Sequence, residues 1–269
     1  MPDQTFHQNV VILTGASSGI GYELALLLAE QGAWLTLAAR RAERLEELAA
    51  KCRELGGRAL IVPTDVGIEA DCKTLVERTV AEYGRIDTLV NNAGRTMWAR
   101  FDEMETLEPL HIIMQVNYFG SVYCTHYALP YLKQTKGRIV AVSSMTGKTG
   151  VPMRTGYSAS KHALVGFFEA LRVELQGSGV TVSLIFPDFV ATETRYQAFG
   201  ADGAVVGESH VREGEIMSAR ACARIMLEDM AQRKRQDLMS LRGKLGQWVK
   251  LIAPGVVDNI ARQAIEKGK

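Results

Sequence analysis

The chain of 269 residues alternates short apolar runs with longer segments of helical pattern, and this alternation limits how it can fold. Each apolar run has the length of a strand, and each segment between two runs has the length of a helix. Strands that alternate with helices form a parallel sheet covered on both faces, so the sequence predicts an α/β fold. The expected strands are Val10–Leu13, Trp34–Ala39, Ala59–Val62, Thr88–Val90, Arg138–Val142, Val180–Phe186 and a last one near Asp237–Ser240.

The composition sets broad limits on the class of protein. With 47% hydrophobic residues the chain can bury one sizeable core, and we expect a single domain over residues 1–269. Its 31 basic and 30 acidic side chains leave a formal charge of +1, which offers no electrostatic basis for binding nucleic acid. Four scattered cysteines without a C-x-x-C pair predict neither a metal site nor disulfides. The polar start and the lack of a bilayer-spanning run predict a cytoplasmic protein.

The first expected strand runs into a glycine-rich loop, TGASSGIG at residues 14–21, and then into a helix. Glycines permit a tight turn and a close backbone approach, and a helix N-terminus offers free N–H groups to an anion. An ordinary strand-to-helix turn is the alternative, because the spacing differs from G-x-G-x-x-G. The position favours a cradle for the phosphates of a dinucleotide, made by Gly15, Ser17, Ser18, Gly19, Ile20 and Gly21.

The end of the second expected strand indicates which dinucleotide is bound. NAD sites usually place a carboxylate there to hold the ribose hydroxyls. This chain instead has Ala38-Ala39-Arg40-Arg41. Arginines suit the 2′-phosphate of NADP(H), through charge-assisted and often bidentate hydrogen bonds. Alternatively, Arg40 and Arg41 only begin the charged helical face that continues to Leu55; we favour the phosphate role, more strongly for Arg40 than for Arg41.

Seven motifs in order and at matching spacing resemble the classical short-chain dehydrogenase/reductase family. The resemblance covers about Gln8 to about Ser240, and no single motif would carry it. The stretch Gly137–Leu175 is most similar to a subgroup with hydroxysteroid-dehydrogenase-like enzymes and related reductases. The motifs are Thr14-Gly15-x-x-x-Gly19-x-Gly21, Asp65-Val66, Asn91-Asn92-Ala93-Gly94, Asn117, Ser144, Tyr157-x-x-x-Lys161, and Pro187 with Thr192.

This resemblance implies a fold, a reaction and an assembly. The fold would be a Rossmann-type doubly wound parallel sheet of about seven strands, with three helices on each side. The activity would be NADP(H)-dependent, reversible reduction of a ketone or aldehyde to an alcohol. A homodimer or homotetramer is implied in the same way.

Four side chains would carry the chemistry. A free tyrosine, with a pKa of about 10, is a poor acid or base at neutral pH, but a nearby cation lowers that pKa. Tyr157 and Lys161 are four residues apart and share one face of a helix. The resemblance makes Tyr157 the general acid and base, Lys161 its partner and a ribose ligand, and Ser144 the donor to the substrate oxygen. Asn117 would hold a water for proton supply, or else it only caps or kinks its helix.

The resemblance also distributes the remaining cofactor contacts. Asp65, followed by Val66, would contact the adenine. The chain departs from the family at Asp188, where a glycine is usual after Pro187, and this affects the backbone path toward Thr192. The other expected contacts are Asn92, Ala93 and Gly94 at the adenosine half, and Pro187, Val190 and Thr192 beside the nicotinamide.

An irregular segment over residues 188–217 contains Gly200, Gly203, Gly207 and Gly214, and we expect it to form a lid on the substrate or a mobile surface loop. Apolar side chains flank the catalytic positions and indicate a small apolar carbonyl or alcohol substrate, although they could belong to the core. The expected pocket walls are Met145, Met153, Phe189 and Tyr196.

Residues 241–269 exceed the minimal fold and have the pattern of an amphipathic helical extension. Pro254-Gly255 divides it before Val256–Ile265. Basic side chains beside an apolar face suit an anionic membrane surface, but packing on a partner subunit or capping of the pocket is favoured here. The apolar face is expected to consist of Leu241, Leu245, Trp248, Val249 and Ile252, with Arg242, Lys244 and Lys250 among them.

Two other functions were weighed against carbonyl reduction. Epimerisation or dehydration with retained NAD fits neither Arg40 nor the chain length and glycine spacing. A catalytically weak nucleotide-binding sensor would keep the fold and lose the reactive side chains. This chain keeps Ser144, Tyr157, Lys161 and Asn117, which favours an enzyme.

Overall fold

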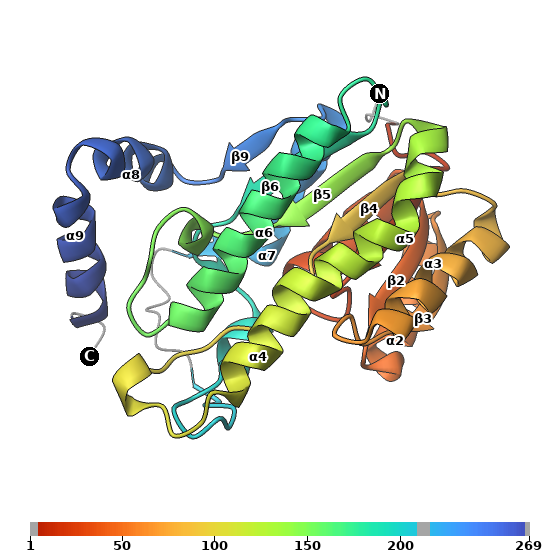
Figure 1. The fold of residues 1–269 in the computed structure, drawn as a ribbon. Coiled ribbons are helices and arrows are strands. Elements are labelled where there is room, and N and C mark those ends of the chain that lie inside the picture. Colours follow the sequence, from red (N-terminus) through yellow and green to blue (C-terminus); the bar gives the residue numbers. More distant parts are fainter. Residues whose placement is uncertain (1–4, 209–215, 267–269) are drawn as a thin grey trace.

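The computed structural model describes residues 5–208 and 216–266, and its centre is a seven-stranded sheet in which each adjacent pair is parallel (Figure 1). The predicted α/β fold is confirmed, and each expected strand is present within a few residues of its predicted bounds. The strands are β1 (Val10–Thr14), β2 (Trp34–Ala39), β3 (Arg58–Pro63), β4 (Thr88–Asn91), β5 (Arg138–Val142), β6 (Thr181–Phe186) and β9 (Gln236–Leu238).

The strand order β3-β2-β1-β4-β5-β6-β9 makes the sheet doubly wound. The central strand β1 pairs with β2 on one side and with β4 on the other, so that Leu13 lies opposite both Leu37 and Val90. The chain therefore reverses its direction of winding between β3 and β4. Ligands of such sheets bind outside the carboxyl ends of the strands at this reversal.

Helices cover both faces of the sheet, as predicted, with three long helices packed on each. The first layer rests on one buried apolar cluster and the second layer on another, with the sheet between them. The first layer is α1 (Gly19–Glu30), α2 (Ala42–Glu54) and α7 (Ala219–Ala231), and the second is α3 (Glu69–Tyr83), α5 (Gly120–Thr135) and α6 (Thr155–Glu174).

The apolar patterns explain these layers. All five residues of β1 are buried, because a parallel strand covered on both faces must be apolar throughout. In α2 the buried residues are Leu45, Leu48, Ala49 and Cys52, a spacing that forms one stripe along a helix. The stripe faces the sheet and leaves the charged side of α2 in solvent.

A widened turn interrupts the helix that leads to the site. The short helix α4 (Glu108–Met114) continues through a π-helical turn, η2 (Gln115–Phe119), into α5. Such single π-turns are rare and are frequent at functional sites. Asn117 lies in this turn and is completely buried, so its amide faces the protein interior.

The segment over residues 188–217 is less irregular than its glycines suggested. It contains β7 (Val190–Ala191), which pairs with β8 (Met217–Ser218), and the 3-10 turn η4 (Glu193–Gln197). Phe199 is hydrogen-bonded on both sides, from its own N–H to Thr96 O at 3.0 Å and from the N–H of Trp98 at 2.8 Å. Gly214 lies outside the described residues, and the lid function stays a prediction.

Two C-terminal helices, α8 (Leu241–Ile252) and α9 (Pro254–Glu266), stand beyond β9 at one edge of the body (Figure 1). Arg242 pairs with Asp188 at 3.1 Å and ties the start of α8 to the end of β6. The predicted apolar face of α8 is exposed, and Trp248 has 70% of its surface in solvent. In the described part of the chain, no helix combines the length and apolarity needed to cross a bilayer. Subunit assembly, membrane contact and cellular location stay predictions.

The contact between α5 and the loop after β3 predicts a stability effect. A Cβ on Gly120 would lie 2.8 Å from the carbonyl oxygen of Val66. This oxygen belongs to the backbone, which cannot easily move away. We expect Gly120→Ala to lower the free energy of unfolding by about 1–3 kcal/mol. Gly166→Ala is the matched control, because no atom lies within 4 Å of the added Cβ in α6, and it should stabilise by up to about 1 kcal/mol. Urea unfolding of both variants checks this, and equal effects would contradict it.

Candidate active site

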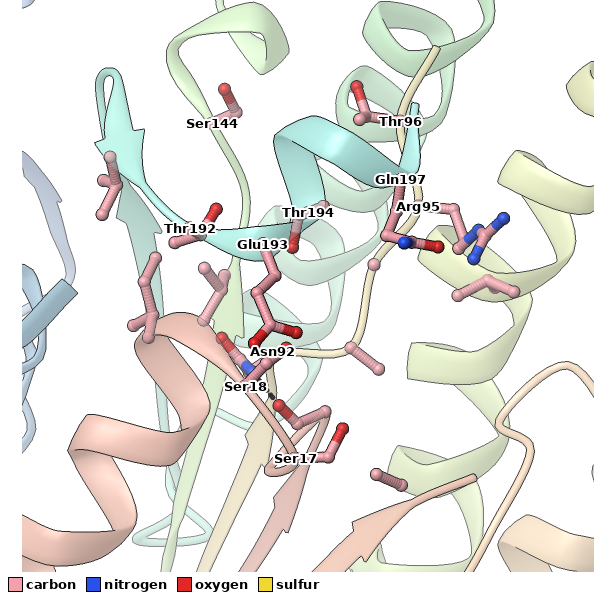
Figure 2. Close-up of a pocket in the computed structure, with 18 of the residues that line it drawn as sticks. Ser17, Ser18, Asn92, Arg95, Thr96, Ser144, Thr192, Glu193, Thr194 and Gln197 are labelled. Atoms are coloured by element: carbon pink, nitrogen blue, oxygen red, sulfur yellow. Dashed lines mark hydrogen bonds between the residues drawn. The ribbon is translucent and has the colours of Figure 1, made fainter. Parts of the chain in front are cut away.

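A cavity of about 360 Å³ opens at the carboxyl ends of the strands, and most of the predicted site residues line it (Figure 2). Gly19, Gly21 and Asn117 do not line the cavity but support residues that do. Of the four predicted pocket walls only Phe189 lines it, whereas Met145, Met153 and Tyr196 do not. The predicted residues at its surface are Gly15, Ser17, Ser18, Ile20, Arg40, Arg41, Asp65, Val66, Asn92, Ala93, Gly94, Ser144, Tyr157, Lys161, Pro187, Val190 and Thr192.

The glycine loop forms the floor of one end of the cavity. Gly15 has a φ of +66°, a left-handed conformation that favours glycine, and a Cβ on Gly21 would lie 2.4 Å from the Gly15 oxygen. Ser18 precedes α1 but makes no side-chain cap, and the first turn of α1 has no acidic residue. The N–H groups and the positive end of α1 therefore stay available to an anion, which fits the phosphates of a dinucleotide.

Asn92 holds this loop in place with its side chain. Its Nδ2 donates to the oxygens of Thr14 at 3.0 Å and Gly15 at 3.2 Å. The N–H groups of Asn92 and Ala93 both donate to Thr14 Oγ1, at 3.0 and 3.1 Å. The amide of Asn92 thus joins the end of β4 to the end of β1 and acts through the shape of the loop.

Two arginines follow β2 at the rim of the cavity. Arg41 donates to Ser17 Oγ at 3.3 Å and pairs with Glu193 at 3.3 Å, with both side chains about half exposed. Figure 2 shows Glu193 extending from η4 toward the glycine loop. Arg40 also lines the cavity, close enough to Arg95 that its charge helps to lower the pKa of that guanidinium, after burial as the main cause. Glu193 and Arg95 were not among the predicted site residues.

Tyr157 and Lys161 share one side of α6 and face the cavity. The Nζ of Lys161 lies 5.8 Å from the centre of the Tyr157 ring and donates to Val142 O at 2.8 Å. Lys161 is only 4% exposed, and this burial lowers its pKa to about 8. The charged ammonium form of Lys161 is therefore poorly stabilised by the protein alone. A phenolate or the hydroxyls of a ribose would stabilise it.

Burial raises the pKa of Tyr157, and three neighbours oppose that effect. The charge of Arg154 and hydrogen bonds with Ser144 and Thr146 all lower the pKa. Ser144 lies two residues after the end of β5 and has an extended backbone. Its Oγ also accepts a hydrogen bond from the N–H of Thr146 at 3.3 Å. Ser143 instead bonds the carbonyl of Lys161, at 3.4 Å. Ser144 is thus the serine that reaches Tyr157.

Asn117 is committed to protein partners from within the π-turn. Its Oδ1 accepts from Arg95 N at 2.7 Å, and its Nδ2 donates to Arg95 O at 3.0 Å and Ser160 Oγ at 2.9 Å. These bonds fix the strand-like segment after Gly94 and the helix that carries Lys161 relative to each other. The role of Asn117 in holding a water stays a prediction.

Sequence reasoning missed three arginines that line the same cavity, Arg95, Arg154 and Arg195. For Arg154 the sequence offered a local signal. A cation immediately before the start of a helix is electrostatically unfavourable, and such a placement indicates a functional role. Arg95 and Arg195 had none, since they lie in loops whose paths depend on the packing of distant elements.

The family comparison agrees with this geometry. Residues 9–201 match the model of the family described as short chain dehydrogenase. The match covers most of the chain, and the chain therefore belongs to the short-chain dehydrogenase family, whose members are oxidoreductases with NAD(P)(H) cofactors. The predicted resemblance is confirmed, including its hydroxysteroid-dehydrogenase-like character.

Individual relatives share most of the chain. It is 36% identical over 262 residues to 11-beta-hydroxysteroid dehydrogenase 1A of Arabidopsis thaliana, covering 95% of this chain and 75% of that protein. It is 34% identical over 263 residues to the dehydrogenase/reductase SDR family protein 7-like of Dictyostelium discoideum, covering 96% and 82%. An alcohol dehydrogenase from the archaeon Thermococcus sibiricus, complexed with 5-hydroxy-NADP, superposes with a TM-score of 0.72 at 25% identity, covering 81% and 88%.

The buried charge of Lys161 predicts a pH-dependent cost in stability. Between about pH 8 and 10.5 the unfolded chain keeps a proton on Lys161 that the folded chain loses, so the destabilising contribution of Lys161 to the free energy of unfolding should shrink across this window. Below pH 8 the full cost is present, and Lys161→Met should be more stable than the wild type by about 2–3 kcal/mol.

Chemical denaturation of the cofactor-free protein from pH 7 to 10.5 measures this difference. The advantage of Lys161→Met should shrink as the pH rises. The exposed Lys133→Met is the control, and a gain that is the same at every pH would show that the burial of charge is not its cause.

Proposed function

We propose that this protein is an NADP(H)-dependent oxidoreductase that reversibly reduces a ketone or aldehyde to an alcohol. The observation that carries the proposal is the grouping of Ser144, Tyr157 and Lys161 in the cavity beside an open helix N-terminus. The residues at the glycine loop suit a dinucleotide, and those on α6 and after β5 suit a carbonyl group. A sensor without turnover would not need this second group of residues.

The side chains have complementary tasks in such a reaction. NADPH, if held at the glycine loop and by Lys161, would supply a hydride to the carbonyl carbon, and the π electrons of the carbonyl would move to the substrate oxygen, which becomes negatively charged. Ser144 donates a hydrogen bond to that oxygen and stabilises the developing charge. The Oη of Tyr157 donates its proton to the same oxygen, and the alcohol is complete.

Lys161 keeps the tyrosine reactive. Burial alone raises the pKa of Tyr157, which would favour the protonated form throughout the cycle. The ammonium of Lys161, on the next turn of the same helix, favours the phenolate that remains after proton donation. Tyr157 can then regain a proton from solvent during reduction, or accept one from an alcohol during oxidation.

Preference for NADP(H) over NAD(H) is supported by the rim of the cavity. Arg40 and Arg41 stand where an NAD site usually has a carboxylate. The similar archaeal alcohol dehydrogenase is complexed with an NADP derivative. For the substrate, Phe189 in the cavity and relatives named as hydroxysteroid dehydrogenases support a molecule with a largely apolar body.

The assignment of Tyr157 as the proton donor predicts a loss of turnover when its hydroxyl is removed. Tyr157→Phe should lower kcat with NADPH by about 10²–10⁴-fold, because the proton donor is lost. The measurement is NADPH oxidation with a panel of apolar ketones and aldehydes. Tyr127→Phe on α5 removes a hydroxyl that bonds Glu69 outside the cavity and should keep full turnover. Full turnover by Tyr157→Phe would exclude the mechanism.

The assignment of the rim arginines to the 2′-phosphate predicts that removing the charge of Arg40 and removing that of Glu193 change the KM for NADPH in opposite directions. Arg40→Ser should raise the KM for NADPH by about 10- to 100-fold and leave that for NADH nearly unchanged. Glu193→Gln should lower the KM for NADPH, because it frees Arg41 from its ion pair. Arg44→Ser, an exposed change on α2, is the control. Equal shifts for NADPH and NADH would contradict recognition of a 2′-phosphate.

A further inference from the structure

One positively charged group in the cavity lowers the pKa of Tyr157, but the reaction described above gives it no contact with the substrate. Arg154 lies beside the reacting end, with its Cζ 4.9 Å from the ring centre of Trp98, 5.8 Å from that of Tyr157 and 5.9 Å from that of Phe189. The aromatic faces provide a partial substitute for water around the cation.

The guanidinium of Arg154 lacks an ionic partner among the described residues. Its Nε is buried without a hydrogen bond, and no carboxylate of residues 5–208 or 216–266 forms an ion pair with it. Two acidic residues of the cavity wall are already engaged, Glu193 with Arg41 and Asp188 with Arg242. Buried charges in proteins are normally paired, so an unpaired one marks a place for a ligand.

A second guanidinium adds to the unpaired positive charge at this end of the cavity. Arg195, on η4, also lines the cavity, and its Nε and Nη1 are buried without hydrogen bonds. Burial lowers the pKa of Arg154, the interaction with Tyr157 opposes this effect, and the charge of Arg195 adds to it. Two cations at one cavity, neither paired with a carboxylate in the described part of the chain, repel each other, and both are stabilised when an anion binds there.

The position of Arg154 in the fold is unfavourable for the same reason. It is the residue before α6, a helix of 20 residues, so its charge adds to the positive end of the helix. Helix N-termini of this kind attract carboxylates and phosphates. Arg154, Arg195 and the end of α6 together provide the electrostatics of an anion site.

This site is separate from the arginines of the proposed cofactor end. Arg95 lies over the ring of Phe199 at 4.5 Å, and its pKa responds to Arg40 and Asp65. Those groups belong to the loops after β2, β3 and β4. Arg154 instead contacts the ring of Tyr157 itself, which is where a substrate must lie.

We infer that the substrate of this enzyme carries an anionic oxygen group, a carboxylate in the simplest case, in addition to its carbonyl or alcohol. Arg154 and Arg195 bind that group while the carbonyl reaches Tyr157 and Ser144, and Trp98 and Phe189 contact the apolar body between them. The inference rests on the proposed function for the reacting end only. It narrows the expected apolar carbonyl compound to an oxo acid or hydroxy acid.

Matched acids and esters test the inference. The probes are 3-acetylbenzoate and 4-acetylbenzoate and their methyl esters, reduced with NADPH by the full-length protein. We expect kcat/KM to be at least about tenfold higher for an acid than for its ester. Arg154→Gln should lower kcat/KM for the acids by about 10- to 100-fold, mainly through KM, and for the esters by a smaller factor, because loss of the Arg154 charge raises the pKa of Tyr157 with both substrates.

Three further variants separate a binding role from a structural one. Arg154→Lys keeps a charge and should retain part of the preference for acids, whereas Arg195→Gln should weaken it. Arg44→Gln, exposed on α2, should leave both substrates unchanged. Thermal melting identifies any variant that fails to fold. Equal losses for acids and esters in folded Arg154→Gln would overturn the inference and assign Arg154 to Tyr157 alone.

Direct binding distinguishes this inference from the proposed function. Titration calorimetry with benzoate and benzamide, in the presence of NADPH, should show tighter binding of benzoate that Arg154→Gln abolishes. If no ketone is reduced but benzoate binds in this way, the anion site stands and the proposed reaction falls. If ketones are reduced but benzoate binds no better than benzamide, or not at all, the reaction stands and the anion site falls.

A measurement of NADPH binding tests whether Arg154 and Arg195 contact the cofactor instead of the substrate. A rise in the Kd for NADPH in Arg154→Gln and Arg195→Gln, with an unchanged ratio of acid to ester, would overturn the inference. The two side chains would then hold the phosphates of the cofactor.

Discussion

Parallel pairing of β1 with both β2 and β4 is the constraint on which the rest of the structure depends. Parallel strands all end at the same edge, so the loops after six strands, β1 to β6, meet above that edge and form one cavity. Side chains that are more than a hundred residues apart, such as Arg41 and Glu193, become neighbours there. The glycine loop can approach this edge closely because Asn92 braces it from the next strand.

The cavity concentrates charge in places that water does not reach. Lys161, Arg95 and Arg154 all have a pKa lowered mainly by burial, and each is held by packing rather than by an ion pair with a described carboxylate. A protein gains no stability from such groups, because their desolvation costs more than their local contacts return. Their presence is understandable when ligands supply the missing negative charge, which the proposed cofactor and the inferred acidic substrate both do.

Much of the fold and part of the site could be predicted from the sequence. The seven strands, the two helical layers and the cavity residues of the glycine loop all follow from local patterns and from the family motifs. Three details did not. Met145, Met153 and Tyr196 were expected in the cavity and lie outside it, and the segment over residues 188–217 proved to contain paired strands. The hydrogen bonds with which the side-chain amide of Asn92 holds the glycine loop were also not predicted.

The sequence by itself determined the elements, their alternation and the residue types at each strand end, because periodicity and turn chemistry act over a few residues. It also determined that Tyr157 and Lys161 share a helix face, since four residues span about one turn. Only the tertiary structure decided which loops meet, that Asn117 occupies a buried π-turn, and that Arg154 lies over the ring of Tyr157 without an ion pair to any described carboxylate. Burial and unmet hydrogen bonds depend on atoms from distant segments, and no local pattern records them.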